Sequence, residues 1–103
     1  MLVTAPSEAK AVELGEHLVD EQLAACVTVV PRVTSIYRWE GRREQAAEAL
    51  LLIKTRADGY EALERRVLAL HPYSVPEVLA LGTDAGAPAY LDWVHDSVVV
   101  EGR

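Results

Sequence analysis

The sequence has little of several residue types that mark particular classes of protein. It holds a single cysteine, Cys26, so an internal disulfide framework is excluded. It has 10 Lys and Arg residues against 16 Asp and Glu, and the formal charge of −6 disfavours a nucleic-acid partner, whose phosphates require a basic face. No apolar run reaches the roughly 20 residues that a membrane helix needs, so we expect no membrane partner.

The start of the chain also lacks the basic segment and the long apolar segment of a signal peptide. Half of the residues are hydrophobic, which is enough for a core, and 103 residues suit one domain. We therefore expect a single cytoplasmic domain over residues 1–103.

Sequence motifs for covalent chemistry are missing too. No serine stands in a nucleophile elbow, and no glycine-rich phosphate loop is present. Cys26 lies in a small and β-branched run over residues 24–30, which is typical of a buried strand and favours a structural role. A cysteine nucleophile would instead need an exposed thiolate with a base nearby. We predict that the protein is not an enzyme.

The strongest structural signal is a long β-hairpin over residues 34–55. Its incoming arm is rich in β-branched and aromatic residues, Gly41-Arg42-Arg43 is the expected turn, and the return arm runs from about Glu44 to Thr55. That arm is about twice the usual five or six residues of a strand. A domain of this size covers only part of such a ribbon, so we expect a neighbouring subunit to cover the rest.

Residues alternate between the two faces of the return arm. We expect Ala47, Ala49, Leu51 and Ile53 on one face and Glu48, Leu50, Leu52 and Lys54 on the other. The lysine that ends the second row is either a surface residue whose stem lies along apolar neighbours or an anion-binding charge in a cleft.

Shorter elements complete the plan. We predict a strand at 2–4, a helix capped by Ser7, the strand at 24–30, a helix capped by Asp58 that stops near His71, a strand at 78–81 and a short helix at 89–95. With the hairpin, the order is that of a split βαβ, ferredoxin-like α+β fold, with two helices on one face of an antiparallel sheet. Pro31 cannot donate a ladder hydrogen bond, so its strand is placed at a sheet edge or a bulge, open to a neighbouring chain.

His71 stands out among the three histidines. It lies at a predicted helix C-terminus, where the helix dipole favours its cation, and it precedes Pro72, Tyr73 and Glu77. A histidine with a carboxylate can ligate a metal ion or exchange a proton. The alternative is a rigid turn with a capping histidine. A role as general base ranks last, because no nucleophile or paired acid accompanies it.

Two aromatic residues share a face of the incoming hairpin arm. Tyr37 and Trp39 are expected to pack in a subunit interface, where aromatic residues are enriched. A stacking platform for a ligand is the alternative.

Several blocks of sequence occur together, in order and at a characteristic spacing. They are Thr4-Ala5-Pro6-Ser7, Leu23-Ala24-Ala25-Cys26-Val27, Ser35-Ile36-Tyr37-Arg38-Trp39-Glu40-Gly41, Ile53-Lys54-Thr55, His71-Pro72-Tyr73-Ser74-Val75-Pro76-Glu77 and Tyr90-Leu91-Asp92-Trp93. Over nearly the whole chain, this pattern resembles the CutA family of divalent-cation tolerance proteins. The resemblance implies a ferredoxin-like subunit in a compact homotrimer, whose long hairpins wrap on neighbouring subunits as in the PII signalling proteins.

The resemblance also implies a ligand cleft between subunits. Its lining would include Tyr37, Trp39, Lys54, Tyr73 and Glu77. The residues that it assigns to structure or interface are Cys26, Pro31, Pro72, Pro76 and Trp93.

For function, the resemblance implies a non-enzymatic trimer of divalent-cation tolerance. Some members carry a cysteine and a second histidine at proposed copper positions, where this chain has Val3 and Leu70, so only His71 of that set remains. We therefore expect weak binding of a divalent cation such as copper near His71, with no cofactor required. The alternative is a PII-like sensor that binds a small anionic metabolite in the intersubunit cleft through Lys54, with Tyr37 and Trp39 in contact.

Overall fold

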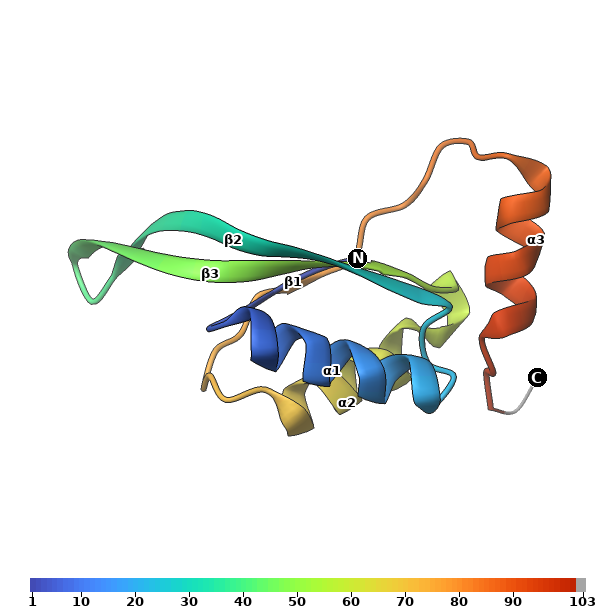
Figure 1. Ribbon diagram of the computed structural model, residues 1–103, viewed down its shortest axis with the longest axis horizontal. Coiled ribbons are helices and arrows are strands. Elements are labelled where there is room, and N and C mark those ends of the chain that lie inside the picture. Colours follow the sequence, from blue (N-terminus) through green and yellow to red (C-terminus); the bar gives the residue numbers. More distant parts are fainter. Residues whose placement is uncertain (102–103) are drawn as a thin grey trace.

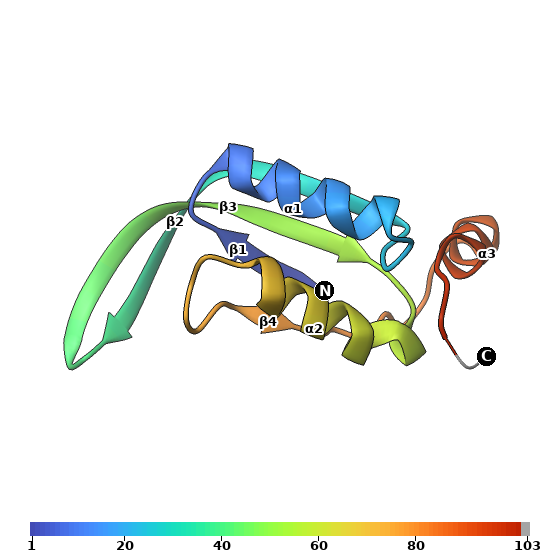
Figure 2. The same ribbon diagram turned by 90° about the horizontal axis from the view of Figure 1, so that it is seen from below.

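Four strands form one antiparallel sheet in the order β2-β3-β1-β4. The computed structural model describes residues 1–101. The strands are β1 (Leu2–Ala5), β2 (Cys26–Trp39), β3 (Arg42–Lys54) and β4 (Val78–Leu79). Helices α1 (Glu8–Asp20) and α2 (Tyr60–Leu70) cover one face of the sheet, and α3 (Pro88–Ser97) lies beyond its end (Figures 1 and 2). The predicted α+β fold, its element order and its antiparallel sheet are confirmed.

The hairpin is longer and its turn tighter than predicted. β2 has 14 residues and β3 has 13, and only Glu40 and Gly41 connect them. These two residues have φ angles of 50° and 78°, as a two-residue type I′ turn requires. The predicted turn at 41–43 is therefore wrong, since Arg42 already pairs with Trp39. The outer half of the hairpin extends past the helices (Figure 1).

Pro31 lies within one continuous strand. The sequence predicted that it separates a strand at 24–30 from the hairpin, but β2 runs through it. The pairing with β3 shifts between Val30 and Val33, so the proline lies at an irregularity of the ladder. The predicted place of this strand at a sheet edge is confirmed.

The core lies between the sheet and the two helices. Its fully or nearly fully buried members are Val3, Ala5, Ala11, Leu14, Leu18, Ala24, Ala49, Leu51, Ile53, Leu63 and Val67. The predicted alternation in β3 holds from Ala49 to Ile53, whereas Ala47 is exposed. α1 packs closely on β2 because Gly15 has no side chain: a Cβ there would stand 3.1 Å from Cγ1 of Val27.

The predicted helix cap is correct for α1 and wrong for α2. The Ser7 hydroxyl accepts a hydrogen bond from the backbone N–H of Lys10, as predicted for the cap of α1. Asp58 is not the cap of α2: it lies in a 3-10 turn (Ala57–Gly59), and the Arg56 guanidinium donates to its carboxylate at 2.9 and 2.7 Å. α2 stops before His71 as expected. β4 is shorter than the predicted strand at 78–81.

None of the helices within residues 1–101 has the length and apolar character needed to cross a membrane.

Candidate functional site

A groove with a volume of about 690 Å³ lies between the hairpin and the loop after α2. Figure 2 shows this loop on the inner side of the bend of the hairpin. We call it the aromatic groove; its lining residues are Thr4, Ser35, Ile36, Tyr37, Trp39, Glu48, Pro72, Tyr73, Ser74, Val75 and Glu77. The structure thus brings four of the predicted cleft residues together: Tyr37, Trp39, Tyr73 and Glu77.

His71 is buried behind this groove, with 8% of its surface exposed. Its Nε2 lies 2.7 Å from the carbonyl oxygen of Thr4, and the backbone N–H of Tyr73 donates to its Nδ1 at 3.1 Å. A carbonyl only accepts and a backbone N–H only donates, so the proton of the neutral ring must be on Nε2. Both ring nitrogens are engaged, and a metal ion could bind His71 only after one of these bonds is broken.

Tyr73 joins the loop after α2 to the sheet. Its hydroxyl donates a hydrogen bond of 2.9 Å to Oε2 of Glu48, and its ring lies 4.8 Å from that of His71. Burial, followed by the hydrogen bond to Glu48, raises the pKa of Tyr73 to about 12. The hydroxyl therefore stays protonated, and remains a donor to Glu48, at neutral pH.

The sequence interpretation missed Glu48, although it is the most buried carboxylate of the groove, with 8% of its surface exposed. The signal that could have found it is a single charge inside the otherwise apolar run from Ala46 to Ile53. Carboxylates are rarely buried to this extent without a partner, so a carboxylate in such a run marks a place with a specific contact.

Lys54 lies far from the aromatic groove within one chain. Its ammonium donates to the Thr28 hydroxyl at 2.6 Å and to the Leu52 carbonyl at 3.0 Å. Tyr37 pairs with Glu44, ten residues before Lys54 in β3, which is about 34 Å along a strand. Lys54 is therefore not part of the groove that one chain forms.

The residues predicted to be structural occupy different environments. Cys26 pairs with Lys54 in the ladder and is partly exposed rather than a core residue. Pro72 lines the aromatic groove, and Pro76 is partly buried in the same loop. Trp93 is half exposed on α3 and its ring lies 5.6 Å from that of Tyr90.

The charge of the groove is negative. Its lining includes the carboxylates of Glu48 and Glu77 and no Lys, Arg or His side chain. Within residues 1–101, no three His, Cys, Asp or Glu side chains are grouped so that they could hold a metal ion. The arrangement suits the binding of a positively charged group more than that of an anion.

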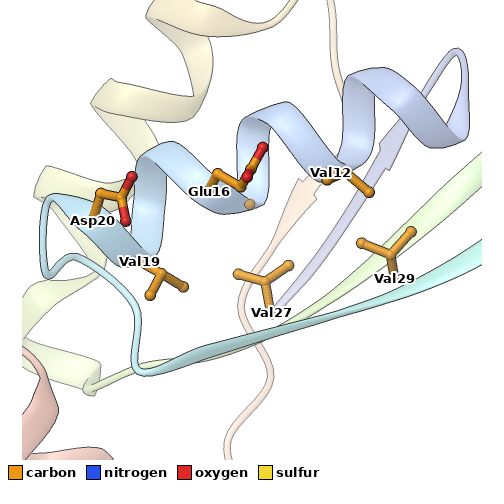
Figure 3. A pocket seen from close by; sticks show the side chains of 7 residues that line it. Val12, Glu16, Val19, Asp20, Val27 and Val29 are labelled. Atoms are coloured by element: carbon orange, nitrogen blue, oxygen red, sulfur yellow. The ribbon is translucent and has the colours of Figure 1, made fainter.

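A second, smaller cavity of about 400 Å³ is lined by residues of α1 and of the edge strand β2 (Figure 3). Four valines and Gly15 form its apolar part, and Glu16 and Asp20 are its charged members. It contains none of the predicted site residues. Its lining has no nucleophile or base beside the two carboxylates, so we assign no catalytic role to it.

Replacing Tyr73 by phenylalanine is expected to reduce the pH dependence of stability in the alkaline range. The pKa of Tyr73 is about 12 in the folded chain and 10.0 without these contacts, so the unfolded chain releases this proton first as the pH rises. The stabilisation is therefore fully present below about pH 10 and is lost as the pH approaches about 12. Urea unfolding of the wild type and of Tyr73→Phe at about pH 9 and about pH 11 measures this change in stability. If both proteins lost the same stability between the two pH values, the assignment would be contradicted.

Comparisons with known proteins identify the family and agree with the fold. The family model of the CutA1 divalent ion tolerance protein matches residues 1–97. The chain is 48% identical over 97 residues to the divalent-cation tolerance protein CutA of Thermus thermophilus and covers 94% of each. A solved structure of Cut A1 from Thermus thermophilus superposes with a TM-score of 0.93 over 95% of both chains. Some animal and plant relatives are longer, and the chain spans between 52% and 64% of their length.

Two further solved structures extend the likeness. The PII-like protein CutA from Nostoc sp. PCC 7120 is 33% identical, with a TM-score of 0.89 over 96% of this chain and 95% of that one. The periplasmic divalent cation tolerance protein CutA from Archaeoglobus fulgidus is 33% identical, with a TM-score of 0.92 over 95% of both chains. The family model covers almost the whole chain and the Thermus relative is nearly half identical, so this chain belongs to the CutA1 divalent ion tolerance protein family.

Proposed function

We propose that this chain is a non-enzymatic protein of divalent-cation tolerance that acts as a homotrimer, with the aromatic groove at a boundary between subunits. The observation that supports association is the apolar surface that one chain leaves uncovered; the number of three copies is what the resemblance to the CutA family implies. The large hydrophobic side chains exposed on the hairpin, on β4 with the segment that follows it, and on α3 are Ile36, Tyr37, Trp39, Leu79, Leu81, Tyr90, Leu91 and Trp93. Exposed apolar surface of this extent is typical of a protein interface.

The sheet edges support the same proposal. β2 and β4 are the two edge strands, and β2 is 14 residues long. A long edge strand offers unpaired backbone groups to another chain. In a closed cyclic assembly every copy uses the same two surfaces, so no edge is left to recruit further chains.

The proposal assigns no metal ion to His71. Both of its ring nitrogens hold hydrogen bonds within the chain, so the residue does not fit the copper-ligand role that the sequence predicted. The prediction of an anionic metabolite has little support from the aromatic groove, because Glu48 and Glu77 would repel an anion and Lys54 lies elsewhere. A cytoplasmic location stays a prediction, since a relative is described as periplasmic.

The mass of the assembly tests the trimer directly. We expect native mass spectrometry at micromolar concentration to give three times the chain mass of 11.3 kDa. Trp39→Ala should weaken the assembly by a few kcal/mol, because the half-exposed ring would lose its contact with the neighbouring subunit at the border of the groove. Glu40→Ala, at the exposed turn of the same hairpin, is the matched control. A wild-type protein that stays monomeric across the concentration range would overturn the proposal.

A further inference from the structure

The carboxylate of Glu48 forms no ion pair with a basic side chain among the described residues. It is buried, its Oε2 accepts a hydrogen bond from the neutral hydroxyl of Tyr73, and it takes part in none of the ion pairs found within residues 1–101. Burying a carboxylate without a countercharge is unfavourable. Because Glu48 lines the aromatic groove, a cation bound there would supply the missing charge.

Aromatic rings surround the same space. Tyr37 and Trp39 come from β2 and Tyr73 from the loop after α2, and all three line the groove with more than a third of their surface exposed. Tyr37 lies near enough to Tyr73 to contribute to the raised pKa of that residue. The faces of such rings attract cations, and ammonium ligands are commonly held by several rings together.

The size of the groove and its donor set distinguish an organic cation from a metal ion. A volume of about 690 Å³ falls within the range of small-molecule pockets. Hard metal ions prefer several charged oxygen ligands. The groove has two carboxylates beside the neutral hydroxyls of Thr4, Ser35 and Ser74, and the described residues contain no group of three His, Cys, Asp or Glu side chains that could hold a metal ion. The rings favour a weakly hydrated, polarisable cation instead.

We propose that the aromatic groove binds a small organic cation, with its ammonium or guanidinium group between the rings of Tyr37, Trp39 and Tyr73 and next to the Glu48 carboxylate. Glu77 is the second carboxylate of the groove and adds to its negative potential. His71 is a positioning residue, because its hydrogen bond to the Tyr73 backbone holds that part of the loop. This ligand class rests on the proposed function only in that both proposals concern the aromatic groove.

Arg32 is the competing cation within the chain. Arg32, Glu8 and Glu48 all line another cavity, of about 300 Å³, but no ion pair found within residues 1–101 joins Arg32 to Glu48. If Arg32 supplied the countercharge in solution, its removal would change cation binding. Arg32→Ala is therefore a control variant that leaves the aromatic groove itself intact.

The test is a calorimetric titration of the full chain, because fluorescence would report Trp93 as well as Trp39. The probes are benzyltrimethylammonium, the neutral benzyl alcohol and the anion benzoate, which share one ring and differ in charge. We expect saturable binding of the cation alone. Glu48→Gln keeps an acceptor for Tyr73 and removes the charge, so it should weaken cation binding at least tenfold, whereas Arg32→Ala should leave it within twofold.

Several outcomes would overturn the ligand assignment: equal binding of benzoate, unchanged affinity in Glu48→Gln, an effect of Arg32→Ala as large as that of Glu48→Gln, or no binding of the cation. The last result would also be expected if a basic side chain of a second copy fills the groove. Native mass measured on the same samples separates the two proposals. A trimer that binds no cation overturns the ligand class alone, and a monomer that binds it overturns the trimer alone.

Discussion

Leu51→Ala is expected to lower the free energy of unfolding by about 3 to 5 kcal/mol. Leu51 is fully buried in β3, between Val3 of β1 and Val29 of β2. Its side chain lies in the core under α1 and α2. Alanine would leave a cavity, because three paired strands and two helices hold the surrounding residues in place.

The matched control is Leu68→Ala. Leu68 lies in α2 with 50% of its surface exposed, and alanine is a good helix former, so this change should cost less than about 1 kcal/mol. Urea unfolding followed by circular dichroism compares the variants at one fixed protein concentration, since association would stabilise all of them. Equal losses in Leu51→Ala and Leu68→Ala would contradict the placement of Leu51 in the core.

The fold was predictable where local signals and burial agree. Alternation of apolar residues in β3 identified the buried face from Ala49 to Ile53, and Ser7 identified the start of α1. The turn of the hairpin was misplaced because Glu40 adopts a left-handed conformation that non-glycine residues rarely take. Pro31 was expected to interrupt its strand, but an edge strand with an irregular ladder tolerates a missing donor.

The site was predictable only in part, for a physical reason. Tyr37, Trp39, Tyr73 and Glu77 were expected in one cleft, and they line one groove. The acceptor for His71 is the backbone carbonyl of Thr4, and a backbone group leaves no mark in the sequence.

Glu48 and Lys54 show that the pattern along a strand does not predict the tertiary contacts of its side chains. They were expected on one face of β3, yet Glu48 binds Tyr73 from a distant loop and Lys54 binds Thr28 of the adjacent strand. Alternation predicts which face of a strand a side chain occupies. It does not predict which loop covers that face, because the loop after α2 returns to the sheet from residues far along the chain.

His71→Ala is the second change with a large expected effect, a loss of about 2 to 4 kcal/mol in the free energy of unfolding. The substitution removes the partner of the Thr4 carbonyl, a buried group that costs about 1 to 3 kcal/mol when it is left unpaired. It also removes the partner of the Tyr73 backbone N–H, which is only partly buried and adds about 1 kcal/mol. His95→Ala is the matched control, because the His95 side chain is 63% exposed and its contact with Asp96 spans 3.4 Å. That control should change stability by less than about 0.5 kcal/mol.

A second readout on His71→Ala separates a structural role from a metal-binding role. If the ring serves only to join β1 to the loop after α2, copper titrated into the wild type and His71→Ala should bind equally, as followed by native mass spectrometry. The benzyltrimethylammonium affinity should fall in the same variant, because Tyr73 would lose the contact that holds its backbone. A variant as stable as the wild type that no longer binds copper would show instead that His71 is a metal ligand. The hydrogen bonds to Thr4 and Tyr73 would then have to open when the ion binds.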